Sequence, residues 1–172
     1  FKPNNKTFTG NNKILTFCHL GSTDTAYDFD KIILIIEGLL TVNSNIFIKI
    51  LSNSNNIILS NLIKKSKIKD NQYSIQSVNR FNIVNEINSC DFGIFYAKEN
   101  FSIKSSFPTK IAEFLACGKP IICNNFNSDI TDLIKNNKIG IILDIDDINY
   151  NSFYSILNKL NDSKISYNCR KY

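Results

Sequence analysis

The sequence contains no methionine, and therefore no initiator residue. We expect a piece of a longer protein, or a processed one. No signal peptide is found, and no apolar stretch reaches membrane-spanning length, because the run KIILIIEGLL is short and is interrupted by Glu37. These absences argue against a chain that crosses a membrane.

Metal and disulfide patterns are scarce as well. The five cysteines are odd in number and include no C-x-x-C pair, and His19 is the single histidine. Neither a disulfide framework nor a zinc site follows from that pattern. Because most of the cysteines stand in apolar runs, we expect small buried hydrophobic residues and a reducing, cytoplasmic setting.

A block of like charge is also missing. The net charge is +5, and the lysines are scattered among aspartates and glutamates. This balance suits an anionic small ligand or a nearby membrane surface, and it is equally common in soluble enzymes. Because no basic stripe is interleaved with aromatic residues, no nucleic-acid partner is expected.

The residues that are present suffice for one domain over 1–172, since 43% are hydrophobic and 20% are charged. Apolar runs alternate along the chain with stretches of helical period. The predicted strands are 13–20, 46–51, 73–78, 92–97, 120–124 and 139–144. The predicted helices are 28–43, about 55–66, 80–90, 106–117, 129–137 and about 150–161, followed by an end that frays.

Strands that are apolar on both faces and alternate with helices indicate a parallel sheet covered on both sides. The predicted fold class is α/β, a doubly wound, Rossmann-like sheet of six parallel strands in the order 3-2-1-4-5-6, with 92–97 in its interior. Ligands bind such sheets at the carboxyl ends of the strands. Function is therefore expected in the loops 20–28, 52–55, 78–80, 97–108 and 124–129.

The segment SSFPTKIAEFLACGKPII, residues 105–122, is chemically the most varied of the chain. A long loop precedes it, and Ser106 is the predicted cap of a helix with Pro108 in its first turn. Such a helix start directs free N–H groups and a positive dipole end at the crevice, which favours phosphate, and Lys110 adds a full charge. Glu113 could accept hydrogen bonds from vicinal hydroxyls of a sugar.

The end of this helix is also marked. Gly118 is predicted to terminate it and Pro120 to lead into the next strand. The same residues are typical of a well-capped surface helix, with Lys110 on a solvated face. His19 could point into the crevice, or be a packed or capping residue. Arg80 could flank a base through its planar guanidinium, or be a surface charge at a helix start.

FPTKIAEFLACGKPII resembles the signature of the C-terminal, nucleotide-sugar-binding domain of GT-B-fold glycosyltransferases, the group-one type that builds bacterial polysaccharides. The likeness begins at CHLGSTDTAY, continues in NNFNSDITDLIKNNKIGIILD and covers most of 13–145. It implies one half of a GT-B fold that binds a nucleotide-diphosphate sugar as donor. It also implies a retaining, metal-independent transferase without a cofactor.

The resemblance also has implications for partners. The acceptor would be a polysaccharide or lipid-linked glycan, held by an N-terminal domain that is absent from this chain. The isolated domain would then bind nucleotide sugar but transfer little. The full-length protein would be cytoplasmic, with peripheral attachment to the inner membrane as one option.

Site residues follow from the resemblance position by position. Glu113 matches the glutamate that binds ribose, whereas Ser105 occupies the place of a second glutamate that faces the donor sugar. The loop after the first strand has no Arg, and Lys31 is a distant candidate for the diphosphate. The remaining donor-binding residues implied are Gly21, Ser22, Tyr27, Arg80, Ser106, Pro108, Thr109 and Lys110. Asn127 and Ser128 stand where the family favours glycines.

Two rival functions remain open. A sugar-nucleotide epimerase uses the same fold, but the segment around Glu113 favours a transferase. A non-catalytic nucleotide-binding or interaction domain is consistent with Ser105 and the missing arginine.

Overall fold

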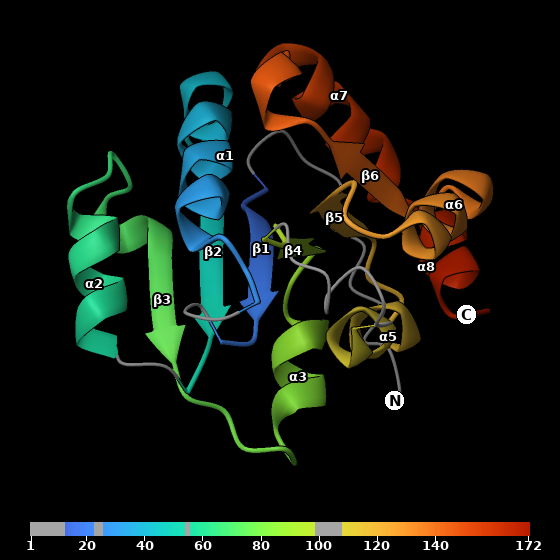
Figure 1. Cartoon of the computed structure of the whole chain (residues 1–172), viewed down its shortest axis with the longest axis horizontal. Helices are drawn as coiled ribbons and strands as arrows, with labels where there is room; N and C mark the ends of the chain where they lie inside the picture. Colours follow the sequence, from blue (N-terminus) through green and yellow to red (C-terminus); the bar gives the residue numbers. More distant parts are fainter. Residues whose placement is uncertain (1–12, 23–25, 54–55, 99–107) are drawn as a thin grey trace.

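One six-stranded parallel sheet lies at the centre of the structure (Figure 1), a computed structural model that describes residues 13–22, 26–53, 56–98 and 108–172. The strands are β1 (Leu15–Leu20), β2 (Ile46–Leu51), β3 (Tyr73–Gln76), β4 (Phe92–Phe95), β5 (Ile121–Asn124) and β6 (Gly140–Leu143). The helices are α1 (Phe29–Val42), α2 (Asn56–Lys64), α3 (Ile83–Asn88), α5 (Thr109–Ala116), α6 (Ser128–Asn137), α7 (Tyr150–Leu160) and α8 (Ser163–Cys169). Two short 3₁₀ turns, η1 (Asp70–Gln72) and η2 (Ile145–Asp147), precede β3 and α7.

The sheet confirms the predicted topology. Its order is β3-β2-β1-β4-β5-β6, and every neighbouring pair is parallel. β4 lies between β1 and β5, so the strand predicted over 92–97 is interior. All six carboxyl ends therefore lie at the same edge of the sheet, toward which the arrowheads of β1, β2 and β3 point downward in Figure 1.

Residues of the central strands alternate between two apolar clusters, one on each face of the sheet. Phe92 and Ile94 of β4 belong to the cluster covered by α1, α2 and α7. Phe95 belongs to the cluster formed with α3, α5, α6 and α8. Because both faces are buried, the strands are apolar throughout, which is why the sequence shows continuous apolar runs and not alternation.

The C-terminal end does not fray, so that prediction is wrong. Residues 163–169 form α8, whose first turn is capped by Asp162, with Oδ1 accepting from Lys164 N at 2.8 Å. Cys169 at its end is fully buried, and α8 packs against α5. Together with Ile165, which packs against both apolar clusters, Cys169 thus anchors the helix to the body of the domain.

The start of α5 also differs from the prediction. Pro108 is the N-cap residue, in extended conformation, and is not in the first turn; Ser106 is therefore not the cap. The carbonyl of Pro108 accepts from Ile111 N at 3.0 Å and closes the first turn. The C-terminal prediction is confirmed, because Gly118 follows the helix with a φ of +72°.

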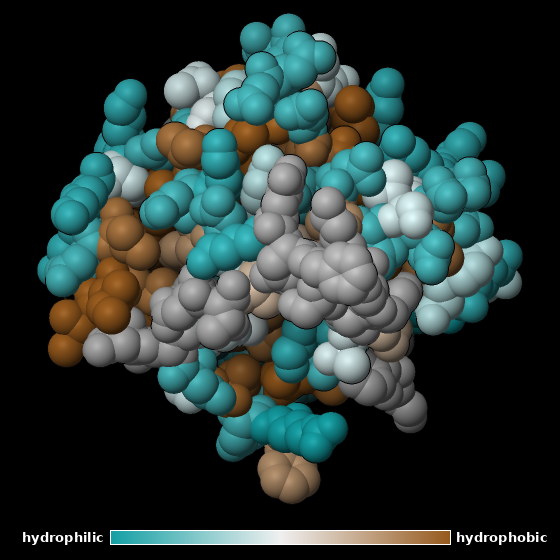
Figure 2. Space-filling view, viewed as in Figure 1, coloured by the Kyte–Doolittle hydropathy of each residue, from teal (hydrophilic) through white to brown (hydrophobic). Residues whose placement is uncertain are grey.

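All five cysteines are buried and free, which confirms their expected role as small apolar residues. Figure 2 shows polar side chains over most of the face in view, with an apolar area at the lower left beside α2, where Ile57 and Ile58 are exposed. No helix among the described residues is both long enough and apolar enough to cross a membrane.

Helix α5 lies close to the sheet because β4 carries a glycine beneath it. A Cβ on Gly93 would lie 2.8 Å from the ring of Phe114, which is fully buried. Phe114 in turn stands edge-on against Phe95, with centroids 5.5 Å apart. The missing side chain at Gly93 thus sets how near α5 approaches β4.

We predict that Gly93→Ala lowers the free energy of unfolding by about 1–3 kcal/mol, because the new methyl group must displace a ring in a filled core. Urea denaturation monitored by circular dichroism measures this. In the double variant Gly93→Ala/Phe114→Leu the two losses should be less than additive. Simple additivity would show that the Gly93–Phe114 contact does not limit the packing.

Candidate functional site

A cavity of about 420 Å³ opens at the carboxyl edge of the sheet, a size typical of small-molecule sites. Its lining residues come from the ends of β1, β2 and β3, from α3 and from the first turn of α5. They are Leu20, Gly21, Ser22, Leu51, Ser52, Asn53, Val78, Ile83 and Lys110. Three of the loops expected to carry function thus meet at one cavity.

The lining divides into an apolar and a polar part. Leu20, Leu51, Val78 and Ile83 supply apolar surface, whereas the serines, Asn53 and Lys110 supply polar groups. Lys110 is the one charged residue among these lining residues. A ligand with a flat or apolar part and an anionic part suits such a lining.

The first two turns of α5 bring together a cation, an anion and the positive dipole end of the helix. The first N–H groups of a helix have no intrahelical partner and form its positive dipole end. Lys110 Nζ lies 3.7 Å from Glu113 Oε2, an ion pair too long for a hydrogen bond. The Glu113 side chain is 26% exposed, yet its Oε2 is enclosed and has no hydrogen-bond partner among the described residues.

An enclosed carboxylate oxygen without a donor is costly to leave in a folded protein. A ligand hydroxyl that reaches Glu113 would satisfy it, since a carboxylate accepts from both of its oxygens. The alternative of a solvated surface helix is less well supported, because both Lys110 and Glu113 are only about one-third exposed or less.

The loop after β1 forms the opposite rim of the cavity. Gly21 has a φ of +141°, and its N–H donates to the carbonyl of Leu51 at 3.0 Å. The ring of Tyr27 packs beneath Gly21 and is 8% exposed. Tyr27, expected among the donor-binding residues, is therefore placed as a support for the loop and does not line the cavity.

His19 is a packed residue, which settles the alternative left open above. It is fully buried between Tyr27, Phe29 and Phe95, and its Nδ1 lies 3.2 Å from the carbonyl of Ile94. Burial lowers its pKa to about 4, although backbone groups of Ile94 and Ser22 oppose the shift. The ring is therefore neutral at pH 7, and Nδ1 carries the proton that Ile94 accepts.

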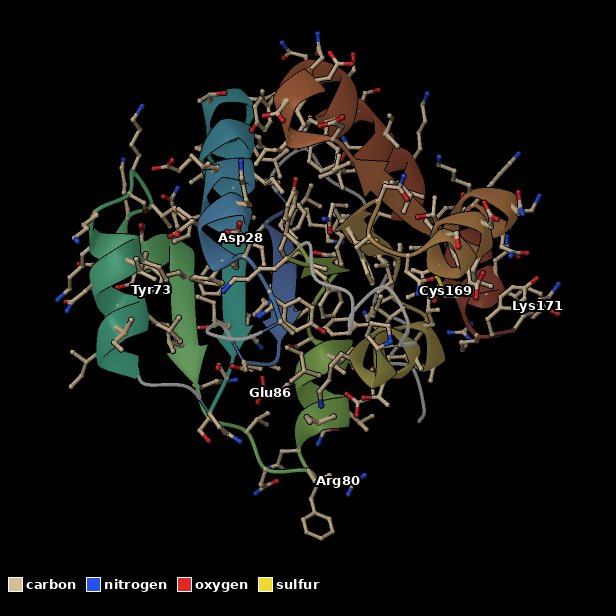
Figure 3. The ribbon with its side chains drawn as sticks, in the orientation of Figure 1. Asp28, Tyr73, Arg80, Glu86, Cys169 and Lys171 are labelled. Carbon is tan, nitrogen blue, oxygen red and sulfur yellow. The ribbon has the colours of Figure 1, made fainter. Side chains whose placement is uncertain are left out.

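The other residues named from the sequence are less closely grouped. Arg80 lies at the tip of the connection into α3 and points away from the sheet (Figure 3), outside the cavity lining. Thr109 is exposed and Pro108 half-buried at the start of α5. Ser105 and Ser106 lie outside the described residues.

Two further positions have local structural roles. Asn127 caps α6 by accepting from Ile130 N at 3.1 Å, and Ser128 is the first residue of that helix. Lys31 lies on α1, and its backbone N–H donates to the Asp28 side chain at 3.3 Å. None of the three lines the cavity.

Sequence reasoning named the loop 52–55 but missed its individual residues. Ser52 is 3% exposed, and its N–H donates to the carbonyl of Gln76 at 3.1 Å, which continues the pairing of β2 with β3. Asn53 accepts from the Ser77 hydroxyl at 2.6 Å. The available signal was the change from apolar to small polar residues directly after β2.

Fold and cavity together define a doubly wound α/β domain with a small-molecule-sized cavity at the carboxyl edge of its sheet. A family model described as glycosyl transferases group 1 matches residues 5–169. The chain belongs to this family, as its signature segment predicted. No curated protein shows significant sequence similarity to the chain.

Solved structures share the fold at low sequence identity. WaaG, a glycosyltransferase involved in lipopolysaccharide biosynthesis, superposes with a TM-score of 0.70 and 14% identity over 95% of this chain and 43% of its own. HepE from Anabaena, in complex with UDP and glucose, gives 0.67 and 13% over 93% and 43%. The catalytic domain of cholesterol-α-glucosyltransferase from Helicobacter pylori gives 0.69 and 12% over 92% and 96%.

The chain thus spans less than half of WaaG and of HepE. The predicted α/β fold of the GT-B type is confirmed by these matches.

We predict that the buried His19 makes the domain acid-sensitive. Its folded pKa of about 4 lies below the ordinary 6.5, so below pH 6.5 the unfolded chain binds a proton that the native state does not. The free energy of unfolding should fall by up to about 3 kcal/mol between pH 7 and pH 4 from this group. Chemical denaturation at each pH, compared with His19→Asn, isolates the effect. Parallel pH profiles of the two proteins would contradict it.

Proposed function

We propose that this domain binds a nucleoside-diphosphate sugar as the donor-binding half of a glycosyltransferase. The observation that carries the proposal is the enclosed Glu113 Oε2, which has no hydrogen-bond partner among the described residues and lies beside Lys110 in the first turns of a helix that starts at the cavity. Family membership supports glycosyl transfer and favours it over the epimerase alternative.

The diphosphate is assigned to the start of α5 and the loop after β1. Lys110 supplies the positive charge, the helix start supplies N–H donors and a positive dipole end, and Gly21 and Ser22 face it across the cavity. In this arrangement the diphosphate is bound without an arginine from the loop after β1. The arrangement is also consistent with a transfer that uses no metal, the expectation drawn from the resemblance.

The nucleoside is assigned to the part of the cavity between β2, β3 and α3. Leu51, Val78 and Ile83 give an apolar surface suited to one face of a base, and Ser52 and Asn53 add polar groups. The ribose would then lie toward Glu113, whose carboxylate can accept hydrogen bonds from two vicinal hydroxyls. HepE and TarM, whose structures contain UDP, share this fold.

Transfer itself requires a second domain in this proposal. The chain spans a third of TarM and 43% of WaaG, so these neighbours carry a further part of comparable or greater length. We propose that an acceptor-binding domain supplies the glycan or lipid-linked acceptor and that the reaction retains the anomeric configuration. The buried free thiols are consistent with the reducing, cytoplasmic setting expected from the sequence.

We predict that Glu113→Gln and Glu113→Ala each weaken the binding of a nucleoside diphosphate about tenfold or more. Hydrogen bonds to a charged acceptor contribute on the order of 1.5–3 kcal/mol, and both variants remove the charge. Isothermal titration calorimetry with uridine, guanosine and adenosine diphosphates measures the change.

The matched control is Glu37→Gln on α1. The Glu37 carboxylate accepts from Lys67 N, and Glu37 is not among the residues that line the cavity. The affinity of this variant for nucleotide should equal that of the wild type. If Glu113→Ala unfolds the domain while the folded fraction of Glu113→Gln binds normally, Glu113 is a structural residue and the proposal loses its main support.

We predict that Lys110→Met weakens binding of the phosphate part of the ligand and leaves binding of the nucleoside part nearly unchanged. Affinity for a nucleoside diphosphate should fall about tenfold, because a charge-assisted contact with phosphate is lost, whereas affinity for the matching nucleoside should stay within about twofold. Lys135→Met, in the last turn of α6, is the matched control for the loss of one charge. An equal fall for nucleoside and diphosphate would refute the phosphate role.

A further inference from the structure

Asn124 is a buried amide at the carboxyl end of β5, and the residue is 9% exposed. It pairs with the backbone of Ala97, which follows the neighbouring strand β4. Its Oδ1 accepts from Ala97 N at 2.8 Å, and its Nδ2 donates to Ala97 O at 2.9 Å. The side chain thus makes the two bonds that a strand would make, just beyond the end of β4. The sequence placed this residue at the end of the predicted strand 120–124, where the loop 124–129 begins, and assigned it no role.

On its other side Ala97 is joined to the segment that leads into α1. Ala97 and Tyr27 form an antiparallel bridge. Lys98 N donates to the carbonyl of Ala26 at 3.0 Å, and Asp28 N donates to the carbonyl of Tyr96 at 2.7 Å. Residues that follow β1 and residues that follow β4 are thereby held to each other at the edge of the sheet.

The bridge continues to the rim of the cavity. The Tyr27 ring lies beneath Gly21, where a Cβ would be 3.1 Å from its Cε2. The same ring is held edge-on by His19, with centroids 5.2 Å apart and planes at 85°. Gly21 lines the cavity, so an unbroken series of contacts runs from Asn124 through Ala97 and Tyr27 to the cavity rim.

We infer that Asn124 is a positioning residue for the candidate site, and we call the series Asn124, Ala97, Tyr27 and Gly21 the clasp. It joins the loop after β1 to the residues that directly follow β4, and so holds in place the rim of the cavity that carries Gly21. Asn124 does not line the cavity and touches no ligand in this assignment. The inference rests on the proposed function for its ligand.

The first arm of the test needs no ligand. In Asn124→Ala both bonds to Ala97 are lost, and amide hydrogen exchange followed by NMR should become about tenfold faster at Ala97. Because the clasp is continuous, exchange should also become faster at Lys98 and Asp28, whose N–H groups cross between the two segments. Faster exchange at Ala97 alone would overturn the continuity of the clasp.

The second arm measures affinity for uridine, guanosine and adenosine diphosphates, with the wild type measured first. Asn124→Ala should weaken binding of the preferred nucleotide about tenfold, because the rim that carries Gly21 is no longer held in one position. If this variant does not fold, Asn124→Ser, which fills more of the space, replaces it in both arms.

Asn149→Ala is the matched control, since Asn149 also uses its side chain on a backbone N–H, that of Ser152 at 3.0 Å, at the start of α7. It should lose stability without any change in nucleotide affinity or in exchange at Lys98 and Asp28. Equal affinity of Asn124→Ala and wild type, or an equal loss in Asn149→Ala, would overturn the inference. Failure of the wild type to bind any nucleotide would instead overturn the proposed function, and the positioning role with it. The exchange measurement needs no ligand, so it tests the continuity of the clasp whether or not the wild type binds a nucleotide.

Discussion

The close approach of helix α5 to the sheet is the constraint on which the rest of the site depends. Gly93 leaves room for the ring of Phe114, and this packing decides where the first turn of α5 stands at the sheet edge. Lys110 and Glu113 lie on that turn and the next, so their positions are set by an apolar contact and not by their own interactions. An ion pair of 3.7 Å between partly exposed groups contributes little by itself.

Polar groups inside the domain are few, and most of them serve the carboxyl edge of the sheet. His19, Ser52 and Asn124 are buried at the ends of β1, β2 and β5, and each has a backbone hydrogen-bond partner on a neighbouring strand or on the loop that follows one. These bonds continue the strand pairing beyond the last regular residues. A buried, satisfied polar group has essentially one low-energy arrangement, so it can hold a loop more exactly than apolar packing can.

Among the described residues, Glu113 is the charged side chain with an enclosed oxygen, Oε2, that lacks a hydrogen-bond donor. A buried polar atom in that state calls for an explanation, and a bound ligand is the one proposed above. The family match over residues 5–169 supports glycosyl transfer, and WaaG, HepE and TarM share the fold. These structures show a common fold and no more, because identities of 11–14% do not establish that individual ligand contacts are shared.

The sequence by itself determined the sheet, its strand order and the helix that carries Glu113, because apolar runs buried on both faces and right-handed crossovers permit few other arrangements. It misjudged the segment 163–169, where the apolar contacts of Ile165 and Cys169 outweigh polar composition, and the start of α5, where the extended backbone of Pro108 delays the helix. Tertiary structure alone decided that Tyr27 supports Gly21, that His19 is packed and neutral, and that Asn124 reaches Ala97. The contacts of His19 and Asn124 join different strands, and Tyr27 is held under Gly21 by its bridge to Ala97 beyond β4. No local pattern encodes distances between residues that only the folded sheet brings together.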